Sequence, residues 1–476
     1  MSLQLYDTLS RQIKPLHPED GRIFRFYCCG PTVYGPAHIG NFRTFINQDI
    51  LRRTLEVAGL NTRHVRNLTD VDDKTIAAAN REGCSLREIT DRWTDRFHED
   101  SEKLGLLPPH EEPRATDHIQ AQIDMIVRLV EIGHAYATDE GSVYFRVSSY
   151  DDYGKLSRLK EREITHDHAP AGSDRMDADE YERDSVCDFA LWKSHKPTDG
   201  SVSWDSPWGP GHPGWHIECS AMSRIYLGDT FDLHAGGVDL LFPHHENEIA
   251  QSEASNGKPF ARHWFHNTHL MVEGQKMSKS LGNLFTVADA IERGYGPRAL
   301  RYVLMSGHYR QQLNFTWASM NAATSAIKRI DKAAAHLAEA SGRSIDQINS
   351  EIGHSPANGS EWNGLQKAWQ ALCDDLNVPA ALGGFFKAIP ELESKKNRDE
   401  AILAQDRMHR FLYALGLLPE TMQSVTAPEE IIALANERWA AKESKDYATA
   451  DRLRAKLTET GWKVLDRKDG FDLEPL

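Results

Sequence analysis

The chain has 476 residues, 40% of them hydrophobic, and a formal net charge of -15. Single hydrophobic cores stop growing at about 250 to 300 residues, so this length predicts several domains. No apolar run approaches the roughly 18 residues that cross a bilayer, the N-terminus lacks a secretory signal, and 6 scattered cysteines fit a reducing compartment. We therefore expect a cytoplasmic protein with no membrane span and no generally basic surface for nucleic acid.

The first 116 residues have the order strand, turn, helix, strand. Residues 22–29 alternate in part between apolar and polar and then meet Gly30-Pro31, which predicts a strand that ends at a turn. Apolar spacings of three and four predict a helix over 41–58, and a short strand follows over 62–68. This order predicts a doubly wound α/β domain, in which ligands bind at the carboxyl ends of strands.

The later segments change character along the chain. A helix, a hairpin-like piece and the polar stretch 160–184 predict an insertion, after which the α/β pattern resumes with the strand 230–235. Long apolar periodicities then predict a helical bundle. The expected divisions are 1–116 and 214–275 for the two halves of the α/β domain, 117–213 for the insertion, 276–330 for a Lys-rich loop and the region after it, 331–420 for the bundle, and 428–476 for a C-terminal domain.

A Pro- and Gly-flanked turn carries His38 between the first predicted strand and helix. A helix N-terminus presents free N–H groups and partial positive charge to phosphate, and an imidazole adds a donor. The alternative is a histidine that caps its own turn. The turn predicts a phosphate site only in combination with a second motif, and its sequence is Pro36-Ala37-His38-Ile39-Gly40-Asn41.

The second motif is a Lys-rich segment between Gly274 and Gly282. A solvated basic loop is one interpretation. The flanking glycines favour a loop that brings Lys276 and Lys279 to the pyrophosphate leaving group, where negative charge develops during phosphoryl chemistry. Because this motif and the His38 turn occur together, we predict an ATP site.

A third group of residues is typical of a metal site. A helix that begins near Pro243 would place His244 and Glu248 on one face, and Cys29 and Cys219 each follow a predicted strand end or turn. Four such ligands could close around zinc. Buried inert thiols and a surface histidine-rich helix are the alternatives. The spacing leaves two choices open: His244 or His245, and Cys28 or Cys29.

Four longer runs resemble the cysteinyl-tRNA synthetases, a family of class I aminoacyl-tRNA synthetases. The likeness follows the order of the chain through most of its length. The paired His38 and Lys276 motifs resemble the ATP signatures of that class, with Asn41 where the family often has histidine. The four runs are 27–34, 67–74, 214–222 and 236–248.

The resemblance implies an architecture and an activity. We expect a Rossmann-type doubly wound catalytic domain with an inserted connective domain, an α-helical bundle, and a small C-terminal anticodon-binding domain. The implied activity is selection of L-cysteine, formation of cysteinyl-adenylate with ATP, and transfer to the 3′ end of tRNA(Cys). We also expect one Zn²⁺ per subunit, Mg²⁺ with ATP, and a monomer. A metal–thiolate bond would separate cysteine from serine, which an ordinary pocket discriminates by only about 10 to 200-fold.

The resemblance also implies roles for individual residues. Three of them have simpler structural alternatives: Thr69 as a helix cap, Trp215 as a core aromatic and Asp239 as a turn residue. The implied catalytic residues are His38, Lys276 and Lys279; the further ATP contacts are Gly40, Asn41 and Asp239; the amino-acid contacts are Gly30, Thr69 and Trp215; and the zinc ligands are Cys29, Cys219, His244 and Glu248.

The C-terminal region separates two rival functions from the ligase. The segments 375–382 and 438–454 resemble the helical bundle and terminal domain of the tRNA enzyme, which disfavours a related ligase that joins cysteine to an amino sugar. A non-catalytic paralogue is disfavoured because both ATP motifs are present. The tail 467–476 departs from the family pattern, so anticodon contacts transfer least securely. A candidate phosphate track, or a solvated helix face, consists of Arg452, Arg454, Lys456 and Lys463.

Overall fold

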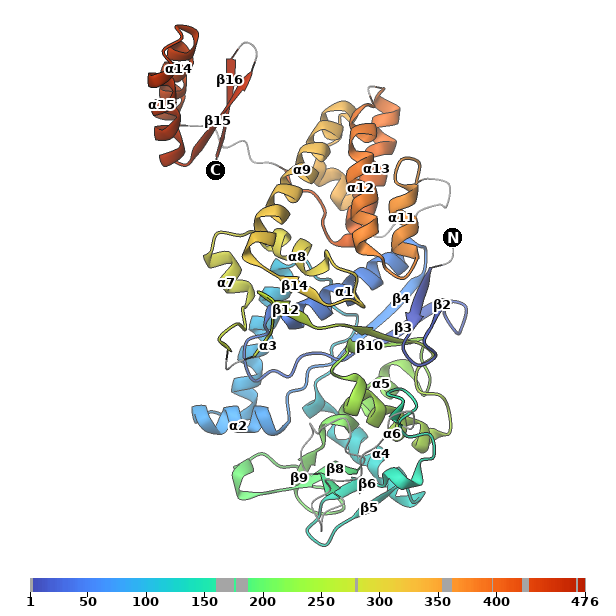
Figure 1. The fold of residues 1–476 in the computed structure, drawn as a ribbon. Coiled ribbons are helices and arrows are strands. Elements are labelled where there is room, and N and C mark those ends of the chain that lie inside the picture. The colour runs from blue at the N-terminus through green and yellow to red at the C-terminus, as the bar shows by residue number, and fades with distance from the viewer. Residues whose placement is uncertain are drawn as a thin grey trace. The chain divides into compact units, whose positions relative to one another are not determined.

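The computed structural model describes residues 3–159, 175–176, 187–278, 281–352, 362–395, 397–421, 428–467 and 470–475. The chain divides into two units, Met1–Glu420 and Thr421–Leu476, each described here by itself (Figure 1). The Lys-rich segment between Gly274 and Gly282 is called the signature loop from here on. Its Lys279 and most of the polar stretch 160–184 lie outside the described residues. Among the described helices, none is both long enough and apolar enough to cross a membrane.

A four-stranded parallel sheet forms the centre of the first unit. Its order is β11 (Trp264–Asn267), β10 (Leu233–Gly237), β3 (Ile23–Cys28) and β4 (Asn61–Arg66). The chain moves from β3 to β4 in one direction and from β10 to β11 in the other, so the strand order reverses between β3 and β10. Doubly wound sheets bind their ligands at the carboxyl ends of the strands beside such a reversal.

Helices cover both faces of this sheet. The helix α1 (Ile39–Val57) connects β3 to β4 and packs against α8 (Pro297–Met305). On the other face, α5 (Trp215–Leu227) and α6 (Glu246–Asn256) pack against each other, and α6 leads from β10 to β11. Figure 1 shows α1 on one side of the strands and α5 and α6 on the other.

The alternation of side chains along β3 divides two cores. Phe26 and Cys28 belong to the cluster built with α1, whereas Tyr27 and Cys29 belong to the cluster built with α5 and α6. Successive residues of a strand point to opposite faces, and this rule continues to Cys29, directly after the strand. Cys28 is therefore a core thiol, and Cys29 faces the two helices that follow the connective insertion.

The predicted insertion contains a second sheet. The strand β8 is its centre, with β6 on one side and β9 or β7 on the other. The helix α4 packs against α5, which joins the insertion to the central domain. The elements from the N-terminus to this sheet are β1 (Gln4–Asp7), β2 (Gln12–Pro15), α2 (Asp73–Glu82), α3 (Leu86–Lys103), α4 (Ile119–Glu131), β5 (Ala135–Ala137), β6 (Val143–Phe145), β7 (Arg175–Met176), β8 (Asp188–Ser194) and β9 (Gly211–Pro213).

A small third sheet carries the start of the signature loop, and a helical bundle follows it. In this sheet β12 pairs in parallel with β14 and antiparallel with β13, and the signature loop begins in β13. The boundaries expected inside the first unit remain predictions. The elements are β12 (Leu270–Val272), β13 (Gln275–Lys276), α7 (Val287–Glu292), β14 (Leu313–Phe315), α9 (Trp317–Ser341), α10 (Ile345–Ile352), α11 (Gln366–Cys373), α12 (Val378–Glu393) and α13 (Arg398–Leu415).

The second unit consists of two helices and a hairpin. The carboxylate of Asp466 accepts hydrogen bonds from Arg438 on the first helix and Arg454 on the second, and Lys442 lies 3.0 Å away. Arg454, which the sequence offered for a phosphate track, is thus engaged within the unit. The elements are α14 (Glu429–Glu443), α15 (Tyr447–Glu459), β15 (Trp462–Arg467) and β16 (Gly470–Pro475).

Candidate active site and metal centre

His38 is the N-cap of α1. The Asn41 backbone N–H donates to His38 Nδ1 at 3.2 Å, and the His38 backbone N–H donates to Asn41 Oδ1 at 3.1 Å. The capping alternative is therefore correct for Nδ1, while Nε2 makes no hydrogen bond to any described residue. Burial lowers the pKa of His38 and the charge of nearby Asp239 only partly opposes it, so the imidazole is neutral at pH 7. The cap fixes the ring and leaves Nε2 available to a phosphate oxygen.

The signature loop lies against this turn. The Ile39 backbone N–H donates to Phe285 O at 2.8 Å, just after the loop. A Cβ atom on Gly40 would lie 3.0 Å from both His38 Nδ1 and Met277 Sδ. The structure thus brings the two predicted ATP motifs together, with Lys276 exposed beside them.

Asn283 shapes the described part of the loop. Its Oδ1 accepts the Ser278 backbone N–H at 2.8 Å, and its Nδ2 donates to Lys276 O at 3.1 Å. These two bonds hold the backbone on either side of Met277 in a bend. Sequence reasoning assigned no role to Asn283, although it directly follows Gly282.

The turn after β10 lies close enough to His38 for the charge of Asp239 to act on the imidazole. Asp239 is exposed at this turn, at the carboxyl end of the strand. A Cβ atom on Gly237 would lie 2.3 Å from Asp239 Oδ1, and one on Gly236 would lie 2.7 Å from the His245 ring. Both glycines are therefore required for the close approach of these side chains to the strand.

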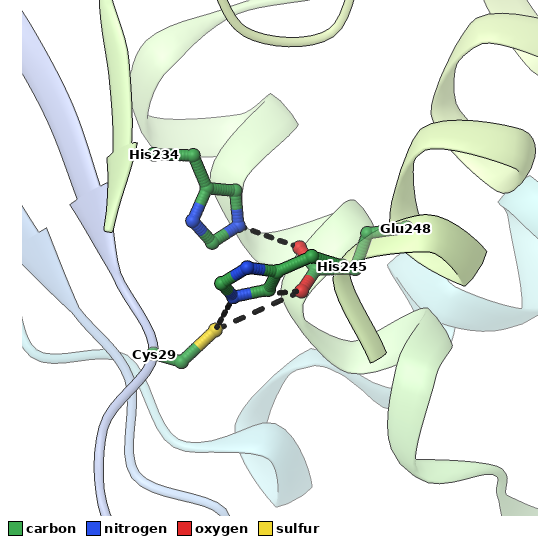
Figure 2. Close-up of side chains that lie close together, drawn as sticks. All are labelled: Cys29, His234, His245 and Glu248. Carbon is green, nitrogen blue, oxygen red and sulfur yellow. Dashed lines mark hydrogen bonds and ion pairs between the residues drawn. The ribbon is translucent and has the colours of Figure 1, made fainter. Parts of the chain in front are cut away.

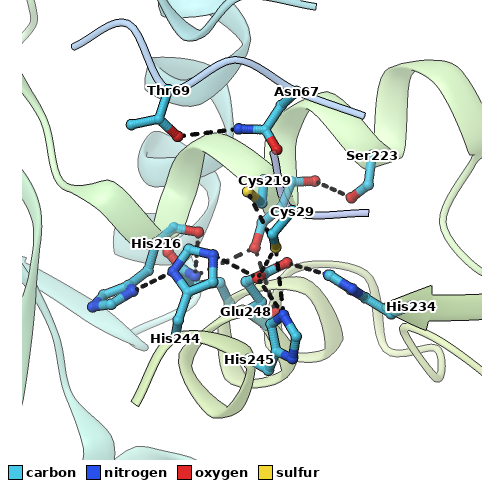
Figure 3. Close-up of polar contacts among 12 residues, drawn as sticks. Cys29, Asn67, Thr69, His216, Cys219, Ser223, His234, His244, His245 and Glu248 are labelled. Carbon is cyan, nitrogen blue, oxygen red and sulfur yellow. Dashed lines mark hydrogen bonds and ion pairs between the residues drawn. The ribbon is translucent and has the colours of Figure 1, made fainter. Parts of the chain in front are cut away.

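Four buried side chains, which come from the end of β3, from α5, and from α6 and the turn before it, converge on one point (Figure 3). The ligand atoms of Cys29, Cys219, His244 and Glu248 all lie within 4.8 Å of one another. Cys29 Sγ lies 3.9 Å from Cys219 Sγ and 3.7 Å from Glu248 Oε1. Tetrahedral zinc, with bonds of about 2.0 to 2.3 Å, holds its ligands roughly 3.3 to 3.8 Å apart. The four atoms fit such an ion.

A second group of four overlaps the first. Cys29, His234, His245 and Glu248 also lie within 4.8 Å of one another (Figure 2). His245 Nε2 lies 3.4 Å from Cys29 Sγ, and His234 Nε2 lies 2.8 Å from Glu248 Oε2. Because the two groups share Cys29 and Glu248, we treat them as alternative ligand sets for one ion.

Outer contacts favour the group that contains Cys219. His244 Nδ1 lies 2.9 Å from His216 Nδ1, and a metal-bound histidine usually donates its other N–H to such a partner. His244 Nε2 lies 2.9 Å from Glu248 Oε1 without forming a hydrogen bond of acceptable geometry to any described residue. This arrangement is expected of two ligand atoms that both point at the same metal position. In the alternative group, the contact to Glu248 occupies His234 Nε2 itself.

The electrostatics of the cluster also fit a cation. Burial, the Cys219 thiol and the Glu248 carboxylate raise the pKa of Cys29 well above its usual value. Burial alone would raise the pKa of Cys219, but its contacts with Cys29 and His244 outweigh that effect and lower it to about 6. His234 and His244 similarly outweigh burial and lower the pKa of Glu248 to about 2. Burial would lower the pKa of His244, but Glu248 and Cys219 in turn raise it to about 10, so protons on Cys29 and His244 balance the two acidic groups, and a divalent ion would displace these protons.

Two local predictions around this cluster were wrong. Cys219 does not follow a strand end; it lies inside α5, whose first residues pack so closely that a Cβ on Gly214 would lie 2.2 Å from Ala190 O. The helix near Pro243 begins later, because Phe242 is extended (φ -142°, ψ 133°) inside a widened turn and α6 starts at Glu246. His244 and Glu248 nevertheless face the same point.

The predicted amino-acid contacts lie beside the cluster. The Gly30 backbone N–H donates to Asn67 Oδ1 at 2.9 Å, and Asn67 Nδ2 donates to Thr69 Oγ1 at 3.1 Å. The Trp215 ring stacks on His244 with centroids 4.2 Å apart. Thr69 is not a helix cap, since Asp72 caps α2, and Trp215 is half-buried rather than a core residue.

Sequence reasoning missed the residues that support the cluster. A relay of contacts connects His245 Nδ1 to His266 Nε2 at 2.8 Å and His266 Nδ1 to Thr8 Oγ1 at 2.8 Å. His216 and His234 contact His244 and Glu248 as described above. The unusual number of histidines, 22 in the chain, was the available signal.

Comparisons with known proteins identify the fold and the family. A family model described as the class I (C) tRNA synthetase catalytic domain matches residues 14–325. Methionyl-tRNA synthetase from Mycobacterium tuberculosis, in complex with methionyl-adenylate, has a TM-score of 0.55 at 14% identity and covers 83% of this chain and 90% of its own. A putative arginyl-tRNA synthetase from Campylobacter jejuni has a TM-score of 0.52 at 14% identity, with 84% and 94% covered. The fold and the matched domain define a class I aminoacyl-tRNA synthetase, as predicted.

Two curated relatives show to which family within this class the chain belongs. A cysteine–tRNA ligase from Opitutus terrae is 53% identical over 482 residues, covering 100% of this chain and 99% of its own length. One from Chlamydia muridarum is 41% identical over 490 residues and covers 100% of both chains. The chain therefore belongs to the cysteine–tRNA ligase family, and the family resemblance inferred from its motifs is confirmed.

Proposed function

We propose that the protein selects L-cysteine with a zinc ion, activates it with ATP and Mg²⁺ as cysteinyl-adenylate, and transfers it to the 3′ end of tRNA(Cys). The observation that carries this proposal is the position of the four candidate metal ligands, which are together called the metal cluster. Cys29 and Glu248 come from opposite sides of the reversal between β3 and β10, and the His38 turn lies at the same edge of the sheet. Amino-acid selection and ATP chemistry would thus meet at one crevice.

The cluster would discriminate the substrate thiol from a hydroxyl. Cys29, Cys219, His244 and Glu248 would hold the ion. Bound zinc supplies a direct bond to a thiolate, whereas a serine hydroxyl stays protonated and is a poor ligand.

Neighbouring residues would orient the remainder of the amino acid. Asn67 holds Gly30 and Thr69 in fixed positions, and Trp215 covers one side of His244. The substrate carboxylate would then lie next to the α-phosphate of ATP without any protein nucleophile, so positioning carries much of the catalysis.

The ATP residues would act on the departing pyrophosphate. The carboxylate oxygen forms a bond to the α-phosphorus as the bond to pyrophosphate breaks. His38 Nε2 would donate to a phosphate oxygen, and Lys276 and Lys279 would balance the charge that develops. Gly40 and Asn41 would allow the phosphates to approach the N-terminus of α1, and Asp239 would contact the ribose.

Cysteine-dependent exchange between ATP and pyrophosphate tests this function. We expect exchange with cysteine and not with serine, loss of exchange after chelation, and recovery with zinc, with the chelated protein still folded by circular dichroism. Charging of tRNA(Cys) tests the acceptor. Exchange without charging, together with transfer to an amino sugar, would favour the rival ligase; folded, zinc-loaded protein without exchange would contradict the proposal.

A further inference from the structure

Arg43 is a fully buried guanidinium without a carboxylate partner among the described residues. It is 0% exposed and donates only to backbone carbonyls: Nε to Thr268 O at 3.3 Å, Nη1 to Leu304 O at 3.0 Å, and Nη2 to His308 O at 3.2 Å and Gln311 O at 2.9 Å. Burial lowers the pKa of Arg43 to about 10, so it remains charged at neutral pH. Burying such a charge costs free energy unless hydrogen bonds replace the lost hydration.

The four carbonyls explain how the charge is tolerated. Leu304 lies in the last turn of α8, where carbonyls have no partner within the helix and the helix dipole is negative. His308 and Gln311 belong to the loop after α8, and Thr268 lies between β11 and β12. Arg43 therefore fastens α1 to three separate pieces of the chain at once.

These pieces support the signature loop. Thr268 lies two residues before β12, and Gln311 lies two residues before β14, its parallel partner. β12 also pairs with β13, in which the loop begins at Lys276. Arg43 lies on the same helix as His38, so its hydrogen bonds join the helix that carries one ATP motif to the sheet that carries the other.

The loop after α8 is also bound to the helical bundle. Tyr309 Oη and the Arg310 guanidinium both donate to Asp375, which precedes α12 in the helical bundle. The loop that accepts from Arg43 is thereby fixed between α1 and the bundle. Arg310 and Gln311 are exposed, but these bonds to Asp375 restrain the loop, so it would adjust poorly to a changed side chain at position 43.

We propose that Arg43 is a positioning residue for the ATP-dependent step, because it sets the distance between His38 and the signature loop. This inference rests on the proposed function. It assigns Arg43 no contact with substrate: the side chain acts through the helix that presents His38, Gly40 and Asn41.

Arg43→Lys tests the inference with minimal disturbance. A lysine keeps the charge, but its ammonium cannot reach four carbonyls around a planar fork. We expect kcat/KM for ATP in pyrophosphate exchange to fall about ten-fold, because misplacement of about 1 Å costs up to a hundred-fold. The KM for cysteine should stay within about two-fold and the metal content should not change, since the metal cluster lies on the other face of the sheet.

Arg301→Lys is the matched control. Arg301 is also 0% exposed and donates to the carbonyls of Leu104 and Leu415 and to Asp49, which lies on α1 eleven residues after His38. This variant should lower the thermal midpoint about as much as Arg43→Lys. Its kcat/KM for ATP should stay within about two-fold of the parent at a temperature where both are folded.

Equal loss of ATP efficiency in the two variants, or an unchanged Arg43→Lys enzyme, would overturn the inference. Calorimetric titration of ATP into wild-type and Arg43→Lys protein decides it independently of turnover. We expect weaker ATP binding in the variant and an unchanged affinity in Arg301→Lys. A wild-type protein without exchange would contradict the proposed function, while the two ATP affinities would still decide the role of Arg43.

Discussion

The metal cluster and the ATP motifs occupy the same edge of one sheet but are built in opposite ways. The four cluster residues are 0 to 6% exposed and are held by an outer layer of histidines, whereas Asn41, Asp239 and Lys276 are exposed. The buried cluster is preorganised and would recognise one small side chain. The exposed motifs would meet a large charged nucleotide that brings its own metal ion. Under the proposed function, this difference would separate substrate selection from charge stabilisation.

Removing a metal ligand should have the largest effect, because it removes the buried site that would select the amino acid. We expect Cys219→Ser to lose its zinc and to reduce cysteine-dependent exchange about a thousand-fold or more, because a neutral hydroxyl replaces a thiolate. Metal analysis of the purified protein and exchange kinetics measure both effects. Cys28→Ser is the control: Cys28 is 0% exposed in the α1 core, so stability should fall while zinc and selectivity remain. Zinc retained by Cys219→Ser would exclude it as a ligand.

The outer layer should matter less than the ligands. His234→Asn removes the 2.8 Å contact to Glu248 Oε2 and leaves all four proposed ligands in place. We expect zinc affinity, measured by competition with a chromogenic chelator, to fall about 10 to 100-fold. His409→Asn, in the helical bundle, serves as a control for replacing a buried histidine. A larger loss in His234→Asn, equal to that of Cys219→Ser, would instead favour the overlapping group as the metal site.

Gly40→Ala tests the exposed ATP motifs without touching the metal cluster. The new Cβ would lie 3.0 Å from His38 Nδ1 and Met277 Sδ, so the ring or the loop has to shift. We expect kcat/KM for ATP to fall about ten-fold. Stability should stay equal or rise by up to about 1 kcal/mol, because alanine is the better helix former. Loss of zinc from this variant would show that the two halves of the crevice are not separable.

The smallest effect concerns a buried histidine outside both sites. Neither ring nitrogen of His64 has a hydrogen-bond partner among the described residues, and burial lowers its pKa well below 6.5. The unfolded chain therefore binds a proton that the folded chain does not, and stability is lost as the pH falls below about 6.5. His64→Leu removes the ionisable group and with it this loss of stability. The variant should therefore be more stable than the parent by about 1 kcal/mol at pH 5.5. Thermal melts at pH 5.5 and 7.5 measure it, and an equal difference at both values would contradict it.

The sequence predicted elements well where apolar spacing was strong. The helix expected over 41–58 is Ile39–Val57, and the strand expected over 62–68 is Asn61–Arg66. The register of Cys28 and Cys29 was not predictable from spacing, because it depends on which face each helix covers. Cys219 was misplaced for a related reason: α5 is buried on most sides, with His216 and Glu218 among its buried residues, so it lacks the usual amphipathic pattern. The histidine contacts and the bonds of Arg43 join residues far apart in sequence, which no local pattern reports.

The adjacent thiols at the end of β3 do not by themselves specify the register of this strand. Because Cys28 and Cys29 are both cysteines, a strand displaced by one residue would still present a thiol toward α5 and α6. The same displacement would turn Tyr27 toward the α1 core and Phe26 away from it. Only the native register brings a thiol at the strand end within 3.9 Å of Cys219 while both aromatic rings keep their faces. A metal ion could therefore also bind a displaced strand, so burial of Phe26 and Tyr27 on their own faces, rather than metal uptake, would favour the native register.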